Sequence, residues 1–168
     1  MPKAEKAETI DIGLEEDARK KSVAVLNTVL SSAAVLYTKT RNYHWNVVGP
    51  QWHDLHELFE QQYEAIAASM DEVAERARSV GGKAVGTMGE FIQCSKIAEE
   101  KPNTFPNART MVQNLVNDHE AIIRDLRESV DATEEWGDAG TSDFLTALME
   151  AHEKMAWMLR SYLEGDGI

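Results

Sequence analysis

The sequence predicts an all-α protein of four long helices, with a long crossover between the second helix and the third. Apolar residues recur at the i, i+3, i+4 spacing of amphipathic helices in four separate segments. Glycine and proline are concentrated between those segments, around residues 49–50 and 81–106. The chain has 168 residues, of which 43% are hydrophobic and 27% charged, which suits one soluble domain with one core.

The first helix is expected from about residue 14 to residue 46, because this segment contains no proline or glycine and its apolar positions follow the helical spacing. The preceding residues, 1–13, mix two lysines with three acids and predict a mobile N-terminal tail. Residues 14–168 then form the bundle domain. Trp45 and Trp157 lie among apolar neighbours, and we expect both to pack rather than to take part in chemistry.

The second helix begins after Pro50, because proline suits the first turn of a helix, and it runs to about Ser79, before two glycines. Residues 81 to about 106 carry four glycines and two prolines around the apolar run FIQCSKIAE. This composition predicts a long crossover that contains a short helix.

The third and fourth helices are predicted by their caps and apolar faces. Asn107 is the expected cap of the third helix, and Thr141 is the expected cap of the fourth. His119 and His152 lie singly in these helices, and we interpret both as structural. They are the next candidate ligands if the metal site departs from the one described below.

Histidines and carboxylates recur at helical spacing in the second helix. The steps from His56 to Glu60, Asp71 and Glu75 are four, eleven and four residues, which puts all four side chains on one helix face. Asp71 lies about 22 Å beyond His56 at 1.5 Å per residue, far beyond the ~2 Å of a metal–ligand bond. A second copy packed antiparallel across a two-fold axis would bring the two ends together, and the pattern therefore indicates a metal site between subunits.

This stretch resembles the ferroxidase signature of the Dps family, the ferritin-like DNA-binding proteins from starved cells. His44, followed by Trp and Asn, matches the first histidine of that signature, and His56 matches the second, twelve residues on. Glu60, Asp71 and Glu75 match the carboxylates, with Glu60 standing where many members have Asp. The resemblance extends over most of the chain.

The resemblance implies a ferritin-like four-helix bundle that assembles as a homo-oligomer, a hollow dodecamer. It implies iron storage and a ferroxidase that oxidises Fe(II) with hydrogen peroxide, protecting DNA from oxidative damage. The implied metal ligands are His44, His56, Glu60, Asp71 and Glu75, and all of these except Glu60 form the implied catalytic set. Imidazole and carboxylate ligands suit iron, with zinc or manganese as alternative occupants.

Acidic residues also gather before the fourth helix. The resemblance implies that they line pores through which Fe(II) enters, whereas a solvated loop with helix-capping acids explains them equally well. These residues are Glu134, Glu135, Asp138 and Asp143.

Composition excludes several other classes of protein. No apolar run is long enough to span a membrane, and the N-terminal residues lack the apolar segment of a signal peptide. The single cysteine, Cys94, excludes an internal disulfide. We therefore expect the protein in the cytoplasm, with the nucleoid as the alternative. A net charge of −12 favours cations over nucleic acid, so we expect weak DNA binding. The alternative function is a nucleoid-compacting DNA binder with secondary iron chemistry. A di-iron site inside one bundle needs Glu three residues before His, and no histidine here has it.

Overall fold

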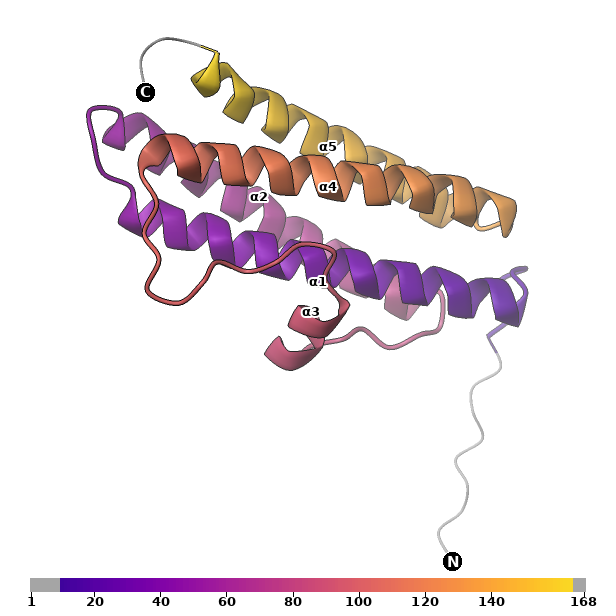
Figure 1. Cartoon of the computed structure of the whole chain (residues 1–168). Helices are drawn as coiled ribbons and strands as arrows, with labels where there is room; N and C mark the ends of the chain where they lie inside the picture. Colours follow the sequence, from indigo (N-terminus) through magenta and orange to yellow (C-terminus); the bar gives the residue numbers. More distant parts are fainter. Residues whose placement is uncertain (1–9, 165–168) are drawn as a thin grey trace, which may run out of the picture.

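Four long helices lie side by side in two antiparallel pairs, with a short fifth helix in the crossover (Figure 1). The computed structural model describes residues 10–164, and within this range it contains no strand. The sequence therefore predicted the all-α class and the helix order correctly. The helices are α1 (Glu16–Asn46), α2 (Trp52–Ser79), α3 (Met88–Cys94), α4 (Ala108–Glu135) and α5 (Ala139–Leu163).

The two pairs, α1 with α2 and α4 with α5, pack against each other around one apolar core. Because the crossover returns the chain along the bundle, α2 and α4 run in the same direction (Figure 1). The core includes Leu26 and Leu36 from α1, Phe59 from α2, Leu115 from α4 and Leu159 from α5, all fully buried. None of the helices in the described part of the chain is long and apolar enough to cross a membrane.

The α2 helix ends at a glycine that the packing requires. Gly81 has φ +96°, a left-handed conformation that glycine adopts without strain. A Cβ atom on Gly81 would lie 2.3 Å from Cδ1 of Ile10, so the chain before α1 is packed against the end of α2. Residues 1–9 of the predicted tail lie outside the described residues.

The short helix α3 begins earlier than the apolar run that predicted it. Thr87 caps it, and Glu90 completes a capping box by accepting from the backbone N–H of Thr87. After Cys94 the chain is no longer helical, because the hydroxyl of Ser95 accepts from the N–H of Ile97 and donates to the carbonyl of Ile97 in a local turn.

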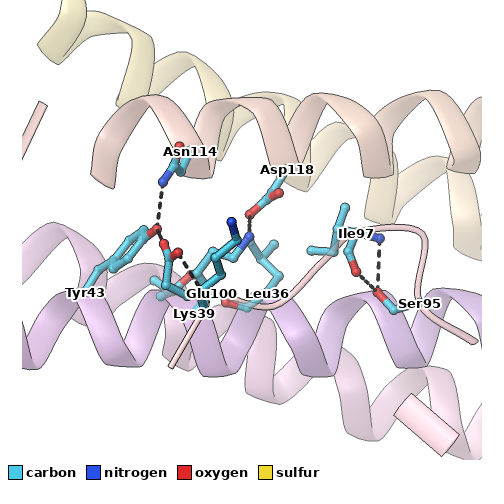
Figure 2. Close-up of polar contacts among 10 residues, drawn as sticks. Leu36, Lys39, Tyr43, Ser95, Ile97, Glu100, Asn114 and Asp118 are labelled. Carbon is cyan, nitrogen blue, oxygen red and sulfur yellow. Dashed lines mark hydrogen bonds and ion pairs between the residues drawn. The ribbon is translucent and has the colours of Figure 1, made fainter. Parts of the chain in front are cut away.

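The crossover is fixed to α1 and α4 by polar groups (Figure 2). The Tyr43 hydroxyl donates to Glu100 of the crossover and accepts from Nδ2 of Asn114 at 2.9 Å. One turn away, Nζ of Lys39 and Oδ2 of Asp118 form an ion pair at 2.6 Å. Burial, together with the hydrogen bond to Glu100, holds the pKa of Tyr43 well above its usual value. The phenol therefore keeps its proton and acts as a fixed donor to Glu100 of the crossover.

The cap of α5 is Asp138, and the prediction of Thr141 was wrong. Oδ1 of Asp138 accepts from the Thr141 N–H at 3.0 Å, and the Thr141 hydroxyl donates to Oδ2 at 2.6 Å. Asp138 is 3% exposed and also forms an ion pair with Arg76 of α2 at 2.9 Å. Helix α5 starts earlier than predicted because the Asp138 carboxylate accepts from the Thr141 N–H in the first turn and also pairs with the Arg76 guanidinium of α2.

Replacing Asp138 by alanine is expected to lower the free energy of unfolding by about 3 kcal/mol, because the cap is lost and the guanidinium of Arg76 loses its carboxylate. Urea denaturation at fixed protein concentration measures this change. Asp143→Ala, an exposed acid in the same helix, is the matched control and should change stability by less than about 0.5 kcal/mol. Equal losses in the two variants would contradict the role of Asp138.

Candidate metal site

His44 and His56 lie face to face where α1 turns back into α2. Their ring centroids are 3.8 Å apart and the ring planes differ by 20°. His44 comes from the last turns of α1 and His56 from the start of α2, so the tight connection through Gly49 and Pro50 brings the two together. The first two residues of the predicted site are therefore adjacent within one chain.

Reciprocal hydrogen bonds fix the tautomer of both rings. Nδ1 of His44 is 2.8 Å from the carbonyl oxygen of His56, and Nδ1 of His56 is 2.9 Å from the carbonyl oxygen of His44. A carbonyl oxygen only accepts, so each Nδ1 carries the proton. Each Nε2 then keeps its lone pair, which is the arrangement in which a histidine binds a metal ion.

Of the three predicted carboxylates, one lies close to His56 along α2 and two lie far from it. Glu60 lies one turn after His56, and its Oε1 accepts a hydrogen bond from the Tyr63 hydroxyl at 3.1 Å. Asp71 and Glu75 are exposed near the far end of α2, about 22 Å and about 28 Å from His56 at 1.5 Å per residue. Within residues 10–164, no three His, Cys, Asp or Glu side chains are grouped closely enough to hold a metal ion.

Aromatic rings surround the two histidines. Trp52 stacks on His56 with centroids 5.1 Å apart, and the edge of Tyr63 meets His44 at 5.2 Å. The guanidinium of Arg41 lies 5.3 Å from the Tyr63 centroid and 5.0 Å from that of Trp45. These contacts hold the imidazoles in place.

Both tryptophans that we expected to pack are instead mostly exposed. Trp45 is 64% exposed and Trp157 is 61% exposed.

Comparison with known proteins assigns the family. Residues 23–166 match the model of the ferritin-like domain. A low temperature-induced protein of Nostoc sp., described as uncharacterized, is 47% identical over 160 residues, or 95% of this chain and 89% of that protein. The DNA protection during starvation protein 2 of Bacillus anthracis is 39% identical over 144 residues, or 86% of this chain and 97% of that protein. The chain belongs to the Dps family.

A solved Dps structure confirms the ferritin-like form of the bundle. The Dps protein from Vibrio cholerae O1 superposes with a TM-score of 0.87 at 28% identity, covering 96% of this chain and 100% of that chain. It is described as a member of a broad superfamily of ferritin-like diiron-carboxylate proteins. The two adjacent histidines of this Dps-family chain, with their free Nε2 atoms, fit iron chemistry of that general kind.

A second pair of histidines lies in the core of this Dps-family bundle. Nδ1 of His119 on α4 and Nδ1 of His152 on α5 are 2.9 Å apart, and both side chains are buried. Burial lowers the pKa of each, to about 4 for His152, and the pair therefore shares a hydrogen bond between neutral rings. Both were expected to be structural, but their contact could not be predicted from a separation of 33 residues.

The four acids around the start of α5 differ in how far they are buried. Asp138 is buried by its contacts with Thr141 and Arg76, as the capping interpretation requires, so it cannot line a pore as it stands. Glu134, Glu135 and Asp143 are exposed. Only these three remain candidates for an entry route.

Proposed function

We propose that this Dps-family protein is a ferroxidase and iron store that oxidises Fe(II) with hydrogen peroxide at sites between two copies of the chain. The observation that carries the proposal is the reciprocal hydrogen bonding of His44 and His56, which places the proton of each ring on Nδ1 and leaves each Nε2 to bind a metal ion. Within residues 10–164, no carboxylate is grouped with this histidine pair closely enough to hold a metal ion, and Glu60 is the one predicted carboxylate that lies a single turn from His56. Ferric iron favours more hard oxygen ligands than this arrangement supplies.

A second copy would supply the missing carboxylates. If two α2 helices pack antiparallel across a two-fold axis, Asp71 and Glu75 of one chain meet His44, His56 and Glu60 of the other, and two equivalent sites form. Asp71 and Glu75 are exposed and have the same charge at i, i+4 spacing, which is unfavourable without a cation between them. We propose that such dimers build a hollow dodecamer in which the ferric product is stored as mineral.

The reaction conserves electrons without releasing a radical. Two Fe(II) ions each give one electron to a single hydrogen peroxide molecule, the O–O bond breaks, and two protons complete two molecules of water. His44 and His56 hold the iron through Nε2, while Asp71 and Glu75 supply negative charge that favours the trivalent product. Removing Fe(II) and peroxide together protects DNA. Zinc or manganese would be retained as competitors rather than oxidised.

The test is anaerobic loading with Fe(II) followed by stoichiometric peroxide, in the parent and in a His56→Ala/Asp71→Ala variant. The parent is expected to develop ferric absorbance within seconds and to keep the iron soluble and protein-bound. The variant should oxidise iron at the slow rate of buffer, because each of its sites has lost a nitrogen and an oxygen ligand. Equal, slow oxidation by both proteins would remove the ferroxidase assignment.

A further inference from the structure

Tyr63 connects two of the predicted ligands that come from different helices. Its hydroxyl donates to Oε1 of Glu60 at 3.1 Å, one turn back along α2. Its ring meets the His44 imidazole of α1 edge-on, with centroids 5.2 Å apart and planes at 76°. The side chain therefore bridges the carboxylate and the imidazole at the end of the helix pair.

The position of Tyr63 is itself fixed from behind. The Tyr37 ring packs against it edge-on at 6.0 Å, and the Arg41 guanidinium lies 5.3 Å from its centroid. Arg41 in turn donates to the Tyr37 hydroxyl. A ring held on these sides cannot turn its hydroxyl away from Glu60 without breaking aromatic and cation–π contacts.

A hydrogen bond at one carboxylate oxygen orients the other. Oε1 of Glu60 accepts from Tyr63, so Oε2 remains available, on the α2 face that also carries His56. A half-exposed glutamate without such a donor samples several rotamers, and it must be ordered when metal binds. The hydrogen bond from the Tyr63 hydroxyl orders Glu60 before the metal binds, so less conformational entropy is lost on binding.

We propose that Tyr63 is a positioning residue of the metal site, which orients Glu60 for ligation and supports the His44 ring; this rests on the function proposed above. Tyr63 binds no metal and transfers no electron. It makes Glu60, a glutamate where many family members have aspartate, a directed ligand.

The test is anaerobic titration of the assembled protein with Co(II), whose visible absorption reports the ligand set without turnover. Tyr63→Phe keeps the ring and removes only the hydroxyl, and we expect it to bind Co(II) about five- to ten-fold more weakly, with a changed spectrum. Tyr162→Phe is the matched control, since it removes a tyrosine hydroxyl from α5, outside the group formed by Tyr37, Arg41 and Tyr63, and it should bind Co(II) like the parent. In iron assays, half-saturating Fe(II) should rise by the same factor in Tyr63→Phe, while the maximal rate changes by less than about two-fold.

A double-mutant cycle separates positioning from a general structural effect. If Tyr63 acts through Glu60, Glu60→Ala and Glu60→Ala/Tyr63→Phe will bind Co(II) equally well. Additive losses, or equal losses in Tyr63→Phe and Tyr162→Phe, would overturn the positioning role. The positioning role would also be overturned if Tyr63→Phe bound Co(II) as tightly as the parent while His56→Ala did not bind it. If instead parent and His56→Ala bind Co(II) alike, the site itself is wrong and the proposed function fails with it.

Discussion

Replacing His56 alone by alanine is expected to slow peroxide-driven Fe(II) oxidation by about 100-fold or more. The substitution removes one Nε2 ligand and also the ring that stacks on His44 at 3.8 Å. It further removes the Nδ1–H donor to the carbonyl of His44, so His44 is held less firmly. Loss of such supporting groups alone costs metal sites about 10–100-fold, and loss of a ligand adds to this.

His53→Ala is the matched control for this prediction. His53 lies three residues earlier on the same helix, is 71% exposed and pairs loosely with Glu57 at 3.6 Å. Stopped-flow ferric absorbance should give the parent rate for His53→Ala and the slow rate for His56→Ala, with both proteins equally assembled by gel filtration. A similar slowing in the two variants would mean that the helix, rather than the His44–His56 pair, controls oxidation.

Acid is expected to destabilise the fold through the buried His119–His152 pair. The pKa of His152 is lowered by burial to about 4 from its ordinary 6.5, and that of His119 is lowered by burial and by His152. Between these values the unfolded chain binds protons that the folded chain does not, so stability is complete above pH 6.5 and falls as the pH drops towards 4. His152 alone accounts for roughly 3 kcal/mol of this loss at 1.36 kcal/mol per pKa unit.

Urea denaturation of the parent and of a His119→Leu/His152→Leu variant at pH 7.5 and pH 4 measures this effect. Leucine is close to histidine in volume and carries no proton, so the variant should lose at least roughly 3 kcal/mol less than the parent on acidification. Asp118, the residue before His119 in the sequence, keeps its ion pair with Lys39 in both proteins. His53→Leu, at an exposed position, should lose as much stability as the parent between pH 7.5 and pH 4. An equal acid-induced loss in the double variant would show that other groups govern the pH dependence.

The sequence predicted the four long helices because periodicity, glycine and proline are local signals. The cap at Asp138 was missed, since its advantage over Thr141 depends partly on Arg76 from another helix. The start of α3 could have been found, because Thr87 and Glu90 have the spacing of a capping box. Local signals therefore predicted the helices, but not the ends that tertiary contacts select.

The ligand pattern on α2 could be read from spacing, but its geometry could not. Neither the stacking of His44 on His56 nor the tautomers set by their carbonyl partners follows from a separation of twelve residues. The Tyr63–Glu60 contact was equally hidden, although i, i+3 spacing allows it. The buried His119–His152 pair needs the packing of α4 on α5, which no local pattern encodes.

The claim that sites are shared between subunits is tested most directly by complementation. His56→Ala and Asp71→Ala chains, each inactive alone, are unfolded, mixed and reassembled, and Fe(II) oxidation by peroxide is measured. If His56 of one chain works with Asp71 of the other, each mixed dimer regains one intact site and loses both groups from its second site. The account predicts that the mixture recovers about a quarter of the parent rate, as random pairing of two chains requires. No recovery, in mixtures that reassemble fully, would contradict a site built from two subunits.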